Sequence, residues 1–121
     1  MKEDYIMPVL PTFCKTYPPE LSQFIGEIGK REEFFIKFVD IRWIARLGSN
    51  VINIVDSNGN YGVYFSKEAP PGIFVGDCAV IKMTPKKQEI STFHQGKETT
   101  FSRIRLIENV GSKDCPKSVR Y

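Results

Sequence analysis

Apolar and polar residues alternate along several short stretches between residues 34 and 108, a pattern that indicates strands rather than helices. The stretch 34–46 is long and rich in β-branched and aromatic residues, apolar on both sides in its first half and on one side in its second. Because most strands hold about five or six residues, this one is expected to bend and to be shared by two sheets. Four further strands are predicted at residues 51–56, 61–66, 78–84 and 99–108.

Glycine, proline and asparagine mark the connections between these strands. Asn58-Gly59 lies between two apolar runs and predicts a tight hairpin. Pro70-Pro71, in the connection to the fourth strand, leaves room for a turn but not for a helix. The fourth strand is expected to end near Pro85, and the polar residues 86–97 are expected to form a long mobile loop.

The two ends of the chain carry different signals. Four prolines fall between residues 8 and 19, which argues against a helix or a central strand there. Residues 1–21 are therefore expected to form an extended proline-rich arm, with one helical turn near its end. Residues 109–121 hold little apolar material and are predicted to be a basic, flexible tail, which leaves residues 22–108 as the folded domain.

The order of these elements predicts an all-β fold. A long first strand, a tight hairpin between the second and third strands, and a long loop between the fourth and fifth match the five-stranded OB-fold, a Greek-key barrel. A small SH3-like barrel is the alternative architecture. The length of 121 residues and the hydrophobic content of 41% fit one domain with one core.

Charge is divided unevenly along the chain. Residues 1–81 carry 8 Lys and Arg against 10 Asp and Glu, a net −2, whereas residues 82–121 carry 9 against 4, a net +5. A basic end of this kind favours a polyanionic partner such as nucleic acid, although it also occurs in proteins that need it only for solubility. Every stretch of more than ten residues contains a charged side chain, so no membrane span is expected.

Residues suited to catalysis or metal binding are sparse. Cys14, Cys78 and Cys115 are odd in number and far apart, which argues against a disulfide framework or a zinc site and favours a reduced, cytoplasmic compartment. His94 is the single histidine, and the sequence contains no phosphate-binding loop and no nucleophile motif. The chain is therefore expected to be non-enzymatic and to need no metal or cofactor, with a small metal-dependent nuclease as the enzymatic alternative.

An OB-fold holds single-stranded nucleic acid on its second and third strands, where aromatic rings stack with bases and basic side chains neutralise phosphates. Strict alternation along the third strand turns Val63 and Phe65 inward and exposes Tyr64, which is expected to stack with a base. In the alternative interpretation, Tyr64 only covers a cross-strand neighbour. Asn53 is expected to face outward beside Tyr64, and Trp43 is expected to lie in the core.

Six basic side chains on or beside the predicted strands are the candidate phosphate contacts. They are Arg42, Arg46, Lys86, Lys87, Arg103 and Arg105. Phe93, in the loop before the fifth strand, is a second candidate for base stacking. On the fifth strand, alternation places Phe101 on the outer face with the two arginines, and Ile104 and Leu106 on the inner face. The alternative interpretation of these basic residues is an ordinary solvated surface.

Several short motifs resemble the phage-encoded family of OB-fold single-stranded DNA-binding proteins. They are Phe24–Arg31, Gly59-Asn60, Val63–Phe65, Met83–Lys87 and the run from Gly96 to Leu106. The resemblance covers about residues 22–108 and implies binding of single-stranded DNA in phage replication or recombination, in the cytoplasm of a bacterial host. The sequence departs from the family at Tyr64, where relatives often carry tryptophan, and at Pro85, where they carry an apolar strand residue.

Single-stranded DNA is thus the expected ligand, with replication or recombination proteins as further candidate partners. Two alternatives remain open, namely binding of RNA and docking onto a replication complex as a protein-interaction module. If the domain assembles into a homo-oligomer, the proline-rich arm is the expected contact.

Overall fold

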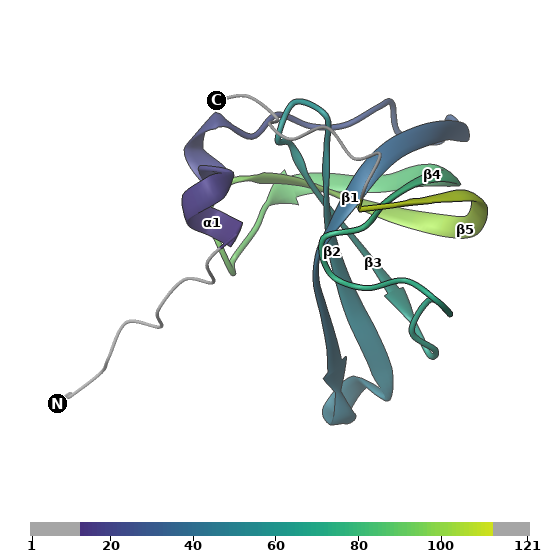
Figure 1. Ribbon diagram of the computed structural model, residues 1–121. Coiled ribbons are helices and arrows are strands. Elements are labelled where there is room, and N and C mark those ends of the chain that lie inside the picture. The colour runs from purple at the N-terminus through teal and green to yellow at the C-terminus, as the bar shows by residue number, and fades with distance from the viewer. Residues whose placement is uncertain (1–12, 113–121) are drawn as a thin grey trace, which may run out of the picture.

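The computed structural model describes residues 13–112, in which five strands close into a β-barrel (Figure 1). The strands are β1 (Glu32–Ile44), β2 (Ser49–Asp56), β3 (Tyr61–Ser66), β4 (Cys78–Ile90) and β5 (Lys97–Gly111). Their order around the barrel is β1-β2-β3-β5-β4; β3 and β5 run parallel, and the other neighbours run antiparallel. This arrangement confirms the prediction of an all-β, OB-type barrel.

The long strand β1 serves both sides of the barrel, as its sequence predicts. It pairs with β4 through residues 32–37 and with β2 through residues 36–44. A one-residue bulge at Val39 interrupts the second register, and bulges bend the strand that carries them. The strand ends earlier than expected, because Ala45–Leu47, which includes Arg46, forms a 3-10 helix (η2).

The hairpin between β2 and β3 forms where Asn58-Gly59 predicts it. The carboxylate of Asp56 closes the turn, since its Oδ1 accepts hydrogen bonds from the backbone N–H groups of Asn58 at 2.8 Å and Asn60 at 2.9 Å. Gly59 has a φ of +81°, a conformation that costs glycine little. The next connection, from β3 to β4, contains no helix, in agreement with the signal from its two prolines.

β4 and β5 are longer than their sequences indicate. Strand pairing continues through Pro85 to Ile90, so the loop expected at residues 86–97 shortens to residues 91–96. The prediction that β4 ends at Pro85 is therefore wrong. A proline is tolerated within a ladder when it lies beside a bulge, and the register of β4 against β5 shifts directly after Pro85.

Two of the four register shifts in the β4–β5 ladder are bulges that change the direction of side chains near the candidate site. Pro85 and Lys87 oppose consecutive residues of β5, which leaves Lys86 as the extra residue of the first bulge. The second bulge lies on β5, where Arg103 has a left-handed φ of 56°. Strict alternation fails across a bulge, so Phe101, which was expected on the outer face, is instead buried in the core.

The main core fills the barrel, and a smaller cluster lies outside it. The main core consists of Ile25, Ile36, Phe38, Ile52, Ile54, Tyr64, Ile73, Ala79, Ile81, Met83 and Phe101. The smaller cluster joins Val39, Val55 and Tyr61 to Tyr17, which follows helix α1 (Phe13–Thr16). Part of the proline-rich segment thus packs onto the barrel.

α1 corrects the expectation that the prolines exclude a helix, whereas the 3-10 helix η1 (Pro19–Leu21) lies near the place where one helical turn was expected. The four-residue turn of α1 fits between Pro11 and Pro18, so no proline falls inside it. Ser22 then ties this segment to the barrel, because its Oγ donates to the carbonyl oxygen of Lys97 at 2.7 Å and accepts from the N–H of Tyr61 at 2.9 Å. The remaining parts of the predicted arm and tail, residues 1–12 and 113–121, lie outside the described residues.

Cys78, buried at the start of β4, is disulfide-bonded. The expectation that wide spacing along the sequence argues against a disulfide is therefore wrong, since distance along a chain does not determine distance in its fold. None of the helices within residues 13–112 has the length and apolar character needed to span a membrane.

Candidate functional site

A groove of about 300 Å³ runs over the outer face of β2 and β3 and under the loop of residues 91–96. We call it the strand-face groove. Its lining includes Arg42, Val51, Asn53, Val63, Phe65, Lys87, Glu89, Phe93 and Thr100. Four residues expected to bind nucleic acid, Arg42, Asn53, Lys87 and Phe93, are therefore brought together here.

Strand pairing sets the rows of side chains on the floor of this groove. Arg42 of β1 faces Val51 of β2, which in turn faces Phe65 of β3. One row further along, Asn53 of β2 faces Val63 of β3. The floor is thus a short apolar strip with an amide inside it, a cation at one side and an aromatic ring at the other.

Arg42 links the floor to the loop above it. Its guanidinium carbon lies 5.1 Å from the centroid of the Phe93 ring, within the range of a cation–π contact. Its Nε also donates to Oδ2 of Asp40 at 2.8 Å. These two contacts hold the planar guanidinium beside an aromatic ring, an arrangement that suits stacking with a further flat group.

Asn53 carries an unsatisfied hydrogen-bond donor on the floor of the groove. The residue is only 3% exposed, and its Nδ2 has no hydrogen-bond partner among residues 13–112. Asn53 lines the outer-face groove, as its predicted facing requires, but its expected exposure is wrong, because only 3% of the residue is accessible to solvent. A buried, unpaired donor costs about 1–3 kcal/mol, and a ligand with an acceptor atom in the groove would remove that cost.

Tyr64 does not lie on the outer face, so its predicted role as a stacking platform is wrong. It is 3% exposed and belongs to the main core, and this burial raises the pKa of its phenol from 10.0 to about 12. Phe65, which alternation placed in the core, is 51% exposed and lines the groove instead.

Gly62 explains why β3 takes this orientation. A Cβ at Gly62 would lie only 2.7 Å from Cε2 of Phe101, so the barrel interior needs a glycine at that place. Gly62 and Tyr64 share a face, and both therefore point inward. The signal for this orientation was present in the sequence, as a glycine inside a strand often marks a close approach.

Trp43 was expected in the core, but its side chain is 57% exposed. It lies one residue before the end of β1 and pairs with Asn50 near the start of β2. At this end of the hairpin, the Trp43 side chain lies on the face that alternation predicts to be the inner one, but the core does not extend as far as this residue.

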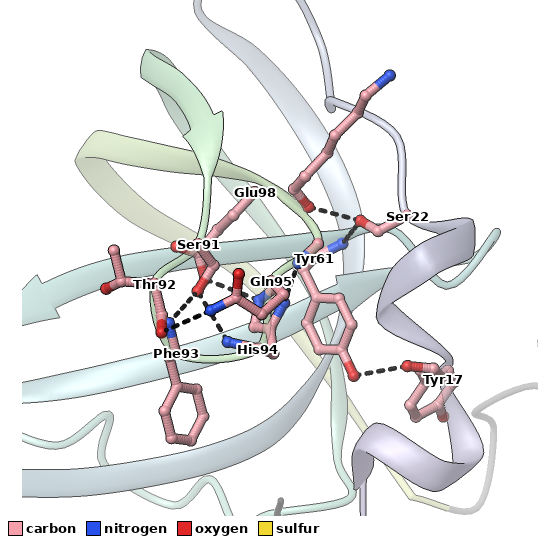
Figure 2. Close-up of polar contacts among 11 residues, drawn as sticks. Tyr17, Ser22, Tyr61, Ser91, Thr92, Phe93, His94, Gln95 and Glu98 are labelled. Carbon is pink, nitrogen blue, oxygen red and sulfur yellow. Dashed lines mark hydrogen bonds and ion pairs between the residues drawn. The ribbon is translucent and has the colours of Figure 1, made fainter. Parts of the chain in front are cut away.

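The loop of residues 91–96 is held by the buried ring of His94 (Figure 2). The ring lies 4.2 Å from the ring of Tyr61, centroid to centroid. Its Nδ1 accepts a hydrogen bond from the N–H of Gly96 at 3.1 Å, so this nitrogen carries the lone pair. With Nδ1 as the acceptor, the ring proton is on Nε2, which lies 3.3 Å from Oε2 of Glu98.

Further hydrogen bonds order the same loop. The Oγ of Ser91 accepts from the N–H groups of Phe93 at 3.0 Å and His94 at 3.3 Å (Figure 2). Below the loop, the hydroxyl of Tyr61 donates to the carbonyl oxygen of Tyr17 at 2.7 Å. Phe93 is therefore presented by an anchored loop, not by the long mobile one that the polar sequence suggested.

A second groove, of about 760 Å³, opens at the end of the barrel where β3 and β5 separate. We call it the mouth groove. Its lining includes Tyr64, Phe65, Pro70, Pro71, Ile73, Lys86, Lys87, Thr100, Phe101, Arg103, Ile104 and Leu106. Ile104 packs against the main core, as expected, whereas Leu106, which was expected on the inner face, is 42% exposed.

The six predicted phosphate contacts are distributed over different surfaces. Arg42 lines the strand-face groove, Lys86 and Arg103 line the mouth groove, and Lys87 lines both. The other two, Arg46 and Arg105, line neither of these grooves. The predicted ladder of Arg103 and Arg105 is not formed, because Arg103 occupies the bulge.

Within residues 13–112, no three His, Cys, Asp or Glu side chains lie together as a metal site would require. Comparisons with protein-family models, with curated proteins and with solved structures find no match to this chain. The geometry of the two grooves is therefore the basis on which a function is proposed.

Proposed function

We propose that the protein binds single-stranded DNA in the strand-face groove and catalyses no reaction on it. The observation that carries this proposal is the set of groups around Asn53: an unpaired buried amide between two accessible aromatic side chains, Phe65 and Phe93. Bases offer flat faces for stacking and acceptor atoms on their edges. A base would therefore offer both a flat face for the aromatic side chains and an acceptor for the Asn53 amide.

The roles of the individual groups follow from their chemistry. Phe65 and Phe93 would stack with bases, and the Nδ2 of Asn53 would donate to a base-edge oxygen or nitrogen. The guanidinium of Arg42, whose carbon lies 5.1 Å from the centroid of the Phe93 ring, would extend the stack or contact a phosphate. OB-folds that bind oligonucleotides use this same face, which supports the proposal by analogy of fold.

The cations of this groove are partly neutralised. Arg42 is paired with Asp40 at 2.8 Å, and Lys87 Nζ lies 3.4 Å from Oε2 of Glu89. Binding here would therefore depend more on stacking and hydrogen bonding than on charge. On the family resemblance alone, the process served would be replication or recombination of phage DNA.

Fluorescence anisotropy with a labelled oligo-dT of about 12 nucleotides, within the span of one OB-fold, tests the proposal. We expect binding at low salt that weakens as salt is raised, because each neutralised phosphate contributes about 0.7 to the slope of log K against log salt. No binding at low salt would contradict the proposal and favour a protein-interaction module. Unlabelled oligo-U serves as the competitor: equal competition would assign the groove to RNA as well as DNA.

A further inference from the structure

We infer that a bound single strand of DNA continues past Phe65 into the mouth groove, where Lys86 and Arg103 contact its phosphates. This inference rests on the proposed function and extends the binding surface to the open end of the barrel. Phe65, Lys87 and Thr100 line both grooves, so the two surfaces are continuous. A DNA strand stacked on Phe65 would therefore reach the second groove across side chains that line both.

The charges of the two grooves differ in a way that suits such a path. The strand-face groove pairs Lys87 with Glu89 and also contains Glu98, so it carries little net positive charge. The mouth groove is lined by Lys86, Lys87 and Arg103 against a single carboxylate, that of Glu68. Neither Lys86 nor Arg103 forms an ion pair with any residue that the structure describes. The uncompensated cations thus lie where the strand would leave the aromatic floor.

Both cations stand at irregular points of the backbone. Lys86 is the extra residue of the bulge on β4, and Arg103 lies in the bulge on β5 with its φ of 56°. A non-glycine residue in the left-handed region is costly and commonly marks a functional position. The Nη2 of Arg31 donates to the carbonyl oxygen of Arg103 at 3.1 Å and so holds this backbone in place. Bulges direct a side chain away from the regular face of its strand, and here they direct two cations into one groove.

The groove also has room and suitable walls for a base. Its volume is about 760 Å³, and Phe65, which is half-exposed, contributes aromatic surface to it. The chain supplies no helix between β3 and β4 that could cover this end of the barrel. An acidic peptide is the competing occupant, but continuity with the aromatic strand-face groove favours a polymer that alternates flat apolar groups with regularly spaced anions.

Affinity as a function of oligonucleotide length tests this inference. An oligo-dT of about 4 nucleotides would fill the strand-face groove only, whereas one of about 12 would reach both grooves. In the native protein we expect the longer oligonucleotide to bind more tightly and with a steeper salt dependence. The double variant Lys86→Gln with Arg103→Asn removes both charges, and asparagine tolerates the left-handed φ at position 103.

The double variant should bind the longer oligonucleotide about tenfold more weakly, with a salt slope smaller by about 1.4, the value for two phosphates of a single strand. Its affinity for the shorter oligonucleotide should not change. Arg105→Gln is the matched control, since Arg105 lies two residues along β5 and lines neither groove; this variant should behave as the native protein at both lengths.

Three results would overturn the inference while leaving the proposed function intact. In the first, the native protein binds the two oligonucleotides with equal affinity after correction for the number of binding registers. In the second, the double variant loses as much affinity for the shorter oligonucleotide as for the longer one. In the third, Arg105→Gln loses as much affinity for the longer oligonucleotide as the double variant does. A mouth groove occupied by a peptide would produce the first result. If neither oligonucleotide binds at low salt, the proposed function fails, and the inference fails with it.

Discussion

The ring of His94 lies 4.2 Å from the ring of Tyr61, and through this contact the loop that presents Phe93 rests on the barrel. Tyr61 belongs to the small outer cluster that also includes Tyr17, so three distant segments of the sequence meet at one point. The geometry of the candidate binding surface therefore depends on a residue, His94, that does not line the strand-face groove itself.

Replacing His94 with alanine should loosen this loop and lower the free energy of unfolding. The change removes a buried ring and two hydrogen bonds, for which a loss of about 2–4 kcal/mol is expected. Hydrogen exchange gives the more specific measurement, because the amide of Gly96 donates to Nδ1 of His94 and should lose its protection. The amide of Gln95, bonded to the carbonyl oxygen of Ser91, reports on the rest of the loop. Unchanged protection at Gly96 would contradict the anchoring role.

Phe65→Ala and Phe93→Ala should each weaken binding of oligo-dT. A stacked base contributes about 1–3 kcal/mol by alanine substitution, which corresponds to roughly five- to 150-fold in affinity. Phe74→Ala is the matched control, because Phe74 is 73% exposed but lines neither groove. Anisotropy titrations at one fixed salt concentration measure all three variants. If Phe74→Ala weakened binding as much as the other two variants, the assignment of the binding site to the strand-face groove would be contradicted.

Asn53→Leu should change stability and binding in opposite directions. Leucine has the same branched shape and number of side-chain heavy atoms and removes the unpaired Nδ2, so the free energy of unfolding should rise by about 1 kcal/mol. Affinity for oligo-dT should fall, because the donor on the groove floor is lost. Urea unfolding and anisotropy on the same preparation measure the two effects.

Asn50→Leu provides the comparison for that experiment. Asn50 is also buried on β2, but its Nδ2 donates to the carbonyl oxygen of Lys67 at 3.4 Å. This variant should therefore be destabilised, since it leaves an acceptor unsatisfied. A loss of stability in Asn53→Leu like that in Asn50→Leu would show that Asn53 has a structural partner after all.

Because the phenol of Tyr64 is buried, we expect the protein to lose stability at alkaline pH. Burial raises the pKa of its phenol from 10.0 to about 12. Since the folded-state pKa is the higher one, the stabilising contribution is complete below about pH 10 and disappears as the pH rises to about 12, a change on the order of 2–3 kcal/mol. Urea unfolding across this range should show a shallower decline in Tyr64→Phe than in the native protein. If the free energy of unfolding fell equally steeply with pH in the two proteins, the alkaline loss of stability would not come from Tyr64.

Gly62→Ala should destabilise the barrel by about 1–3 kcal/mol through overpacking. The added Cβ would lie 2.7 Å from Cε2 of Phe101 and 3.1 Å from Cγ1 of Ile54. Combining it with Phe101→Leu, which shortens the opposing side chain, should recover part of that loss and give a non-additive double-mutant cycle. Additive effects would indicate that the two side chains do not compete for the same space.

The failures of the sequence-based site prediction have one common origin. The prediction of which side chains point into the barrel and which point outward assumed that a two-residue alternation runs unbroken along each strand. On β3 the alternation holds, but its phase depends on the close approach of Phe101 to Gly62, a contact between distant strands. On β5 the bulge at Arg103 breaks the alternation, so Phe101 and Arg105 take different faces.

The sequence by itself determined the class of fold, the number and order of strands, the β2–β3 hairpin and the absence of a helix between β3 and β4. These features follow from local patterns, such as Asn58-Gly59 and Pro70-Pro71, which act through the backbone of a few neighbouring residues. Only the tertiary structure decided which side chains reach the surface and where Lys86 and Arg103 point. Bulges arise from pairing between strands that are distant in sequence, and no local pattern records them; a close approach is marked locally only by a glycine, as at Gly62, and its partner strand is not.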